Sequence, residues 1–137
     1  MRVVFADATY WIALFSPRDS LHATAVEASR GLHQTRIVTS EMILIEMLNS
    51  LAKPSELRQM VVEAVTAIRS DPNTEVVPLS GIQFRDALQH YATHADKEWG
   101  LTDCASFVLM RDRNISEALT HDHHFVQAGF QALLRSA

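Results

Sequence analysis

Residues 100–125, GLTDCASFVLMRDRNISEALTHDHHF, combine a polar start, a long apolar run, a short β-prone run and a second polar start. The run from Asp103 to Arg113 predicts a helix with Thr102 as its N-cap. SEALT, residues 116–120, predicts a strand, and HDHHFVQAG after it predicts a helical turn. A helix, a strand and another helix in direct succession are typical of an α/β fold.

The same alternation extends outward over the whole chain. Strands alternating with helices predict a central parallel sheet of about five strands that is covered by helices on both faces. Because no repeat, low-complexity tract or linker interrupts the pattern, we expect residues 1–137 to form a single domain. The other predicted strands are 2–6, 36–39, 74–79 and 130–134, and the other predicted helices are 8–15, 21–32, 41–52, a helix from Pro54 to the SDPN break at 70–73, and 80–95.

Composition is that of an ordinary globular protein, with 47% hydrophobic and 20% charged residues in 137. No apolar stretch is long enough to span a membrane. The opening MRVVFADATYW carries an acid where a signal peptide needs its apolar run, so we expect neither anchoring nor export. The single cysteine, Cys104, allows no internal disulfide and favours a reducing, cytoplasmic setting.

The charge balance is compatible with a polyanionic substrate. The chain has 16 Asp and Glu against 12 Lys and Arg, a formal net charge of −4, whereas nucleic-acid binders usually have a basic excess. If four acids form one metal site, the remaining 16 − 4 = 12 acids balance the 12 basic residues. The net charge therefore does not exclude a nucleic-acid substrate that binds with metal ions.

Four acids occupy positions where a functional site is expected. Asp7 directly follows the first predicted strand and Asp122 follows the fourth, and ligands of open parallel sheets collect at the carboxyl ends of strands. Asp103 lies in the first turn of its helix, where the helix dipole favours a carboxylate. Glu46 lies mid-helix among apolar residues, with Asn49 and Ser50 on its face.

Each acid also has an ordinary structural explanation. Asp7 could cap the following helix, Asp103 could decorate a helix end, Asp122 could close a turn, and Glu46 could pair with an arginine. Their joint placement is what favours a site. Clustered carboxylates repel one another, and hard divalent cations relieve that repulsion. An all-acid site without Cys or paired His ligands favours Mg²⁺, or Mn²⁺, over zinc.

Three ordered blocks resemble the PIN-domain nucleases, and in particular the VapC-type toxins of prokaryotic toxin–antitoxin pairs. FADATYWIALF (5–15) resembles the opening of that family, with Asp7 as its acid and Thr9 as its hydroxyl residue. TSEMILIEMLNSL (39–51) resembles the second block, with Glu46 as its acid. WGLTDCASFVLMRDRNISEALTHDHHFVQAGF (99–130) resembles the closing block, with Asp103 and Asp122. The match covers nearly the whole chain.

The resemblance implies a three-layer α/β/α fold and a Mg²⁺-dependent endoribonuclease that hydrolyses RNA phosphodiester bonds with metal-activated water. It makes Asp7, Glu46, Asp103 and Asp122 the catalytic residues and metal ligands, with Thr9 and the loop acid Asp96 as candidate supporting residues. It also implies two protein partners, a cognate antitoxin and a second copy in a homodimer. The roles of the three histidines His121, His123 and His124 stay open.

Three alternatives remain at this point. A PIN nuclease of RNA maturation or decay would share the same site but have no antitoxin. A non-catalytic PIN module would bind its partner without cutting RNA. A phosphoacceptor signalling domain also places an Asp after its first strand, but it needs a lysine after a strand, and neither Lys53 nor Lys97 has that position.

Overall fold

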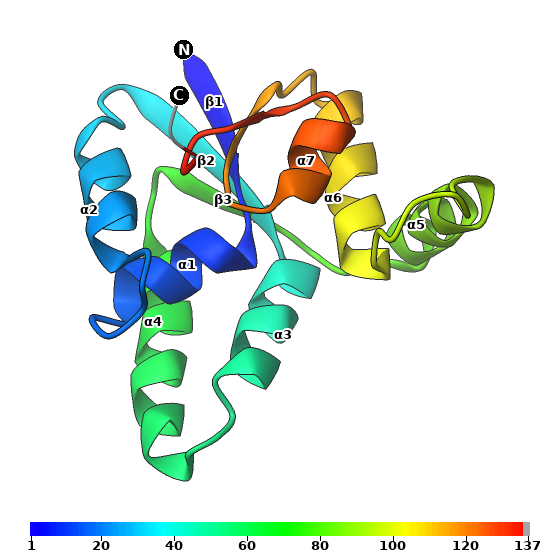
Figure 1. Cartoon of the computed structure of the whole chain (residues 1–137). Coiled ribbons are helices and arrows are strands. Elements are labelled where there is room, and N and C mark those ends of the chain that lie inside the picture. The colour runs from blue at the N-terminus through cyan, green and yellow to red at the C-terminus, as the bar shows by residue number, and fades with distance from the viewer. Residues whose placement is uncertain (136–137) are drawn as a thin grey trace.

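The computed structural model describes residues 1–135 and has a five-stranded, all-parallel sheet with the strand order β3-β2-β1-β4-β5 (Figure 1). This confirms the predicted sheet. Each strand is a short run rich in β-branched or small residues that is bounded by a turn or a helix start. The strands are β1 (Arg2–Ala6), β2 (Thr35–Ser40), β3 (Thr74–Val77), β4 (Glu117–Leu119) and β5 (Gln131–Ala132).

Helices flank the sheet in a three-layer α/β/α arrangement, as predicted. In Figure 1, α1, α2 and α4 lie on one side of the sheet, α5 and α6 lie on the other, and α3 extends beyond the carboxyl ends of the strands. In the described residues the helices are α1 (Ala8–Phe15), α2 (His22–Arg30), α3 (Glu41–Ser50), the 3-10 helix η1 (Ser55–Leu57), α4 (Arg58–Ser70), α5 (Gly81–Thr93), α6 (Leu101–Asp112) and α7 (His123–Gln127).

The order of the strands reverses beside β1. The chain runs from β1 through β2 to β3 on one side and then returns to place β4 on the other side of β1. Phe5 pairs with Ala118 and Ala6 with Leu119, and the N–H of Asp7 donates to the Leu119 carbonyl at 3.1 Å. The carboxyl ends of β1 and β4 therefore lie side by side, at the point where open α/β sheets bind their ligands.

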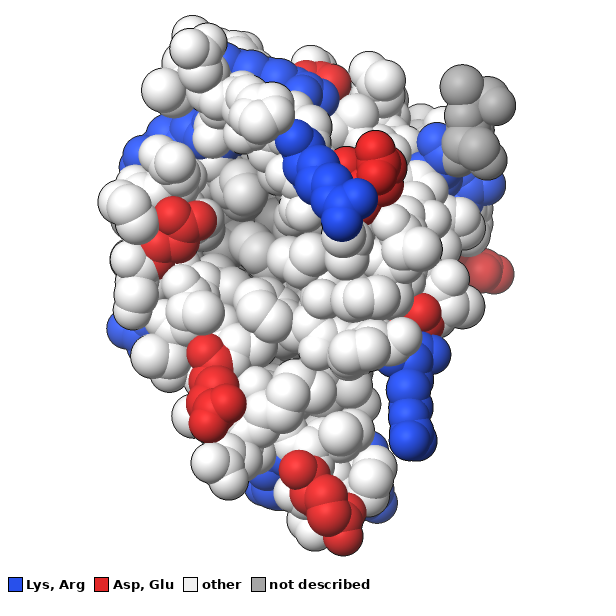
Figure 2. All heavy atoms as spheres, turned by 90° about the vertical axis from the view of Figure 1, so that its left-hand side faces the viewer, with Lys and Arg blue, Asp and Glu red and all other residues white. Residues whose placement is uncertain are grey.

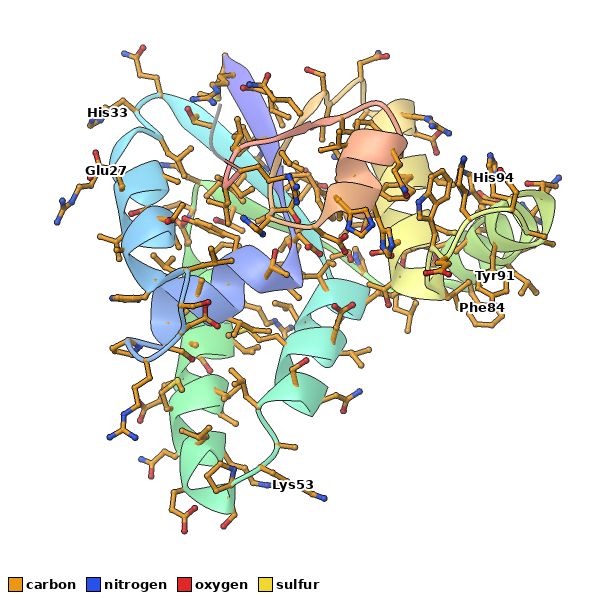
Figure 3. The ribbon with its side chains drawn as sticks, viewed as in Figure 1. Glu27, His33, Lys53, Phe84, Tyr91 and His94 are labelled. Atoms are coloured by element: carbon orange, nitrogen blue, oxygen red, sulfur yellow. The ribbon has the colours of Figure 1, made fainter. Side chains whose placement is uncertain are left out.

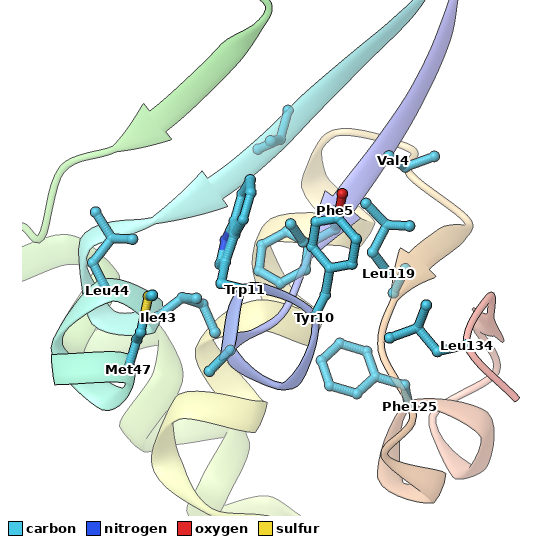
Figure 4. Packing of buried hydrophobic residues seen from close by; sticks show 14 of the residues in the cluster. Val4, Phe5, Tyr10, Trp11, Ile43, Leu44, Met47, Leu119, Phe125 and Leu134 are labelled. Carbon is cyan, nitrogen blue, oxygen red and sulfur yellow. The ribbon is translucent and has the colours of Figure 1, made fainter. Parts of the chain in front are cut away.

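The core fixes this end of the sheet. Phe5 on β1, Tyr10 and Trp11 on α1, Ile43 on α3 and Phe125 on α7 are fully or almost fully buried and pack in one cluster (Figure 4). Burying large aromatic and aliphatic side chains is the main stabilising contribution in a small domain. The helices that begin directly after β1, β2 and β4 are thus held against the sheet at their first turns.

Most predicted boundaries are confirmed within two or three residues. Ser40 and Ser80 cap α3 and α5, with their hydroxyls accepting from the N–H groups of Ile43 at 3.2 Å and Gln83 at 3.1 Å. The prediction that Thr102 caps α6 is wrong. The helix begins two residues earlier, with Gly100 at the cap position, because the side chain of Asp103 accepts a hydrogen bond from the Gly100 N–H at 3.2 Å.

Within residues 1–135, no helix combines the length and the apolar character that crossing a membrane requires.

Candidate functional site

Asp7 is the most deeply buried acid of the site. It follows β1 directly and is only 4% exposed. Two hydroxyls donate to its Oδ2 atom, that of Thr120 at 2.8 Å and that of Thr9 at 3.1 Å. Burial raises the pKa of Asp7 to about 6, while these hydrogen bonds oppose the shift and the negative charge of Asp103 adds to it.

Thr120 connects Asp7 to the fourth acid. Its fully buried hydroxyl donates to Asp7 and also accepts from the backbone N–H of Asp122 at 3.0 Å. The Thr9 and Thr120 hydroxyls lie 3.2 Å apart. Thr9 therefore has the supporting position that the resemblance implies, and Thr120 is a supporting residue that the sequence analysis missed. Thr120 could have been predicted from the sequence, because it lies at the end of β4, two residues before Asp122.

Asp103 lies in the first turn of α6 and is held by two donors. Its Oδ2 atom accepts from the Gly100 N–H at 3.2 Å and lies 3.1 Å from Nδ1 of His124. Its side chain is 18% exposed. Burial raises the pKa of Asp103, and the negative charge of Asp122 adds to the shift, while the bonds from Gly100 and His124 oppose it.

Asp122 is the N-cap residue of α7, and its Oδ1 atom accepts from the His124 N–H at 2.9 Å. The His124 ring also lies 3.4 Å from this oxygen, so one imidazole stands between the carboxylates of Asp103 and Asp122. The position of His124 inside the acid site was not predicted. His121 and His123 are exposed, although ligand atoms of Asp122, His123 and His124 lie within 4.8 Å of one another.

Glu46 completes the cluster from α3. Its pKa is raised to about 7, first by burial and then by the negative charges of Asp7, Asp103 and Asp122. A hydrogen bond from the Thr102 hydroxyl opposes the shift. Interactions between charges weaken with distance and solvent screening, so their effect on the Glu46 carboxyl indicates that the four acids lie near one another. Asp7, Glu46, Asp103 and Asp122 form what we call the acid cluster.

Asp96 is not part of the acid cluster. Its side chain is 71% exposed in the loop between α5 and α6 and pairs with Lys97 at 3.3 Å, which holds the pKa of Asp96 below its usual value.

Two arginines whose positive charge could contact a phosphate form ion pairs with glutamates instead. Arg2, at the start of β1, pairs with Glu117, and Arg113, after the end of α6, pairs with Glu75.

The donor set fits a hard divalent cation. Four carboxylates can supply oxygen ligands. Burial, with the neighbouring negative charges, raises the pKa of Asp7 to about 6 and that of Glu46 to about 7, so that keeping these groups ionised without a counterion is unfavourable. Mg²⁺ prefers oxygen ligands and relieves this repulsion directly. No cysteine takes part, since Cys104 is buried beside Asp103 within the body of α6.

Comparisons with known proteins agree with this geometry. The PIN domain family pattern matches residues 4–131. The chain is 28% identical over 128 residues to the 23S rRNA-specific endonuclease VapC20 of Mycobacterium tuberculosis, a match that covers 93% of this chain and 95% of that protein.

Solved structures show the same fold. The crystal structure of VapC20 from Mycobacterium tuberculosis, described as a sarcin-ricin loop cleaving toxin, superposes with a TM-score of 0.83 at 27% identity, over 93% of this chain and 95% of that one. VapBC2 from Rickettsia felis, solved with a promoter DNA fragment, gives a TM-score of 0.66 at 11% identity, over 95% and 96% of the two chains. FitAcB from Neisseria gonorrhoeae gives 0.61 at 13% identity, over 94% of each. The last two likenesses concern the fold alone.

Proposed function

Because this chain belongs to the PIN-domain family, we propose that it is a divalent-metal-dependent endoribonuclease and the toxin of a toxin–antitoxin pair. The observation that carries the proposal is the convergence of Asp7, Glu46, Asp103 and Asp122 at the switch point of the sheet. The similarity to VapC20 over 93% of the chain supports the choice of RNA as the substrate. On this proposal the protein acts in the cytoplasm, together with its RNA.

Asp7 and Asp103 are the proposed direct metal ligands, with Glu46 and Asp122 completing the site, and Mg²⁺ or Mn²⁺ as the ion. Bound there, a divalent cation supplies a nucleophilic water at neutral pH and offsets negative charge on the phosphodiester. The residues of the chain hold this arrangement. Thr9 and Thr120 fix the Asp7 carboxylate, and the His124 ring lies within 3.4 Å of both Asp103 and Asp122.

Purified protein tests the activity. We expect it to cut RNA with Mg²⁺ and to stop when the metal is chelated. Asp7→Asn should lower cleavage by at least about a hundredfold, since loss of a residue that only supports a ligand already lowers activity by about 10–100-fold. Asp96→Asn is the matched control and should cut like the wild type, because Asp96 is exposed beside Lys97. Equal activity of the wild type and Asp7→Asn would refute the proposal.

Ribosomal RNA is the proposed substrate class. The relatives of the chain include an endonuclease named for 23S rRNA, and the structure of that protein is described as cleaving the sarcin-ricin loop. Mapping of 23S rRNA ends after induced expression of the wild type or Asp7→Asn checks this assignment. New ends that appear only with the wild type are expected. New ends found only in other RNAs would show that ribosomal RNA is not the substrate.

The antitoxin is proposed to occupy the groove between α1, α2 and α4. This groove has a volume of about 360 Å³ and is lined mainly by apolar side chains, among them Trp11, Phe15, Leu32 and Ile68. Figure 2 shows this face as largely uncharged and hollowed near its centre. Co-expression with the product of a short neighbouring gene should block cleavage. A locus without such a gene would favour a PIN nuclease of RNA maturation.

A homodimer is proposed through α5. Ile82, Leu88 and Tyr91 are 64%, 49% and 50% exposed, and Tyr91 lies away from the body of the molecule in Figure 3. Half-exposed large apolar side chains on one helix are typical of protein interfaces. Light scattering should give twice the chain mass, and Leu88→Arg should return the protein to a single-chain mass. A single-chain mass for the wild type would contradict the dimer.

A further inference from the structure

A groove between α3 and α5 adjoins the acid cluster. It has a volume of about 350 Å³, and its lining includes Glu46, which belongs to the acid cluster, and Thr102, which precedes Asp103 in α6. Asn49 and Ser50 line it from α3 and Phe84 lines it from α5. We call it the α3–α5 groove. A molecule that reaches Glu46 therefore meets this groove next to the acids.

The side chains of the groove combine an exposed ring with hydrogen-bonding groups. Phe84 is 49% exposed and is labelled on α5 in Figure 3, while apolar Ile45, 46% exposed, lines the same groove from α3. The Asn49 amide carries donors and an acceptor, and the Ser50 hydroxyl can act as either. Unpaired nucleobases are recognised by this combination, with an aromatic face for stacking and polar groups for the base edge.

We propose that the α3–α5 groove takes one unpaired nucleobase of the RNA, adjacent to the phosphodiester held at the acid cluster. Phe84 stacks on the base, and the Asn49 amide reads its edge and so determines sequence preference. The proposal rests on the ribonuclease function proposed above. A volume of about 350 Å³ suits a single base, since pockets for small ligands begin near 300 Å³.

A second copy of the chain is the competing occupant. A protein surface seated in the α3–α5 groove would cover Glu46 and close the acid cluster to RNA. The dimer face proposed on α5 adjoins the groove, because Phe84, Leu88 and Tyr91 follow one another at three- and four-residue spacing on the helix. A base in the groove, by contrast, leaves the phosphate beside it next to the carboxylates. Continuity with the acid cluster thus favours RNA.

Cleavage of random-sequence, single-stranded oligoribonucleotides in Mg²⁺, with the products sequenced, tests the proposal. Phe84→Leu keeps an apolar side chain but removes the ring, and should raise KM about tenfold with little change in kcat, the loss expected for one stacked base. Phe84→Tyr keeps the ring and should retain the wild-type KM. Val62→Ala, which truncates a 56% exposed side chain on α4, is the matched control and should change neither constant.

Asn49→Ala should weaken the preference for one base at a single position beside the cut by about tenfold, while preferences at other positions persist. Asn73→Ala, an exposed asparagine before β3, is its control. A purely structural role for Asn49 would lower overall activity without changing base preference. Melting temperatures measured for every variant identify any that is merely unfolded.

Three results would overturn the proposal. Phe84→Leu and Asn49→Ala could match the wild type in KM and base preference, or their changes could be reproduced by Val62→Ala and Asn73→Ala. Phe84→Leu could instead lower the mass measured by light scattering, which would give the groove to a second copy. If the wild type cuts and Asp7→Asn does not, these results refute only the base site. If the wild type does not cut RNA at all, both proposals fail.

Discussion

The Asp7 carboxylate lies in a nearly closed position at the end of β1, with a side chain that is 4% exposed. A charged group in such a place needs hydrogen bonds or a counterion. Two threonine hydroxyls supply the hydrogen bonds, and both donate to the same oxygen, Oδ2. A hydrogen bond from the Ala8 backbone also favours the ionised form of this carboxylate. At this scale the site depends on hydroxyl groups as much as on acids.

Thr120→Val should show how much the Thr120 hydroxyl contributes to stability and to metal binding. The substitution removes the donor to Asp7 and the acceptor for the Asp122 N–H without changing side-chain size much. We expect the free energy of unfolding to fall by about 1–3 kcal/mol, because the buried Asp7 carboxylate loses a donor and the Asp122 N–H loses its acceptor. Mg²⁺ affinity should fall by about 10–100-fold. Chemical denaturation and a Mg²⁺ titration measure the two effects.

Thr120→Ser keeps the hydroxyl and serves as the control. If Thr120→Val bound Mg²⁺ as tightly as Thr120→Ser, Thr120 would have no role in holding Asp7.

Single residues also show what a sequence can predict. Asp7 and Asp122 were predicted because they follow strands, and Asp103 because it starts a helix. Thr120 follows the same rule and could have been found. His124 could not, because its distance to Asp103 depends on how α7 packs against α6. Asp96 was a candidate supporting acid from the resemblance, but the loop places its carboxylate in solvent beside Lys97.

At the scale of elements, the first turns of α1, α6 and α7 bring Asp7, Asp103 and Asp122 together. Asp7 and Asp122 occupy N-cap positions, and Asp103 lies in the first turn of α6. Helix dipoles favour carboxylates at these ends, which partly offsets their mutual repulsion. Glu46 is different, because it lies in the middle of α3 and gains nothing from a helix end.

Asp103→Asn should therefore behave as an electrostatic substitution. An amide oxygen can still accept from the Gly100 N–H, whereas the repulsion from Asp122 is lost. Without divalent ions we expect the melting temperature to stay the same or rise. Added Mg²⁺ should stabilise the wild type more than the variant, since ligand binding to the folded state stabilises it. A much lower melting temperature for the metal-free variant would mean that Asp103 has mainly a structural role.

Element boundaries were less predictable than element types. The sequence pattern predicted each strand and α-helix of residues 1–135, although it merged the 3-10 helix η1 with α4. The start of α6 was misplaced: it begins at Leu101 rather than Asp103, because the Asp103 side chain itself supplies the capping hydrogen bond. β5 has two residues where five were predicted, since only Gln131 and Ala132 pair with β4. On α5 only Ala87 is buried. A sequence pattern shows an apolar stripe but not whether another element covers it.

Across the whole molecule, the acid cluster links stability to pH. Asp7 and Glu46 have pKa values raised to about 6 and about 7. The folded protein therefore holds protons on these groups that the unfolded chain has lost, and stability falls as pH rises through that range. For Asp7 the shift from 3.8 to about 6 corresponds to on the order of 3 kcal/mol.

We expect the metal-free protein to be more stable at about pH 5 than at about pH 8. Mg²⁺ should reduce the difference, since it favours the deprotonated carboxylates. Asp7→Asn should remove the part of the decline that lies between about pH 4 and about pH 6, the unfolded and folded pKa values of Asp7. Chemical denaturation at each pH, with chelator or with Mg²⁺, measures the free energy of unfolding for the wild type and for Asp7→Asn. If the metal-free protein instead became more stable from pH 5 to pH 8, the pKa values of Asp7 and Glu46 would not be raised in the folded state.

Calorimetric titration of Mg²⁺ or Mn²⁺ into the wild type, Asp7→Asn and Asp103→Asn at neutral pH tests the central claim most directly. If the four carboxylates form one cation site, the wild type binds with release of protons, because carboxyls with raised pKa must ionise. Each variant should bind at least about tenfold more weakly. Absence of binding by the wild type, or equal binding by all three proteins, would contradict the account.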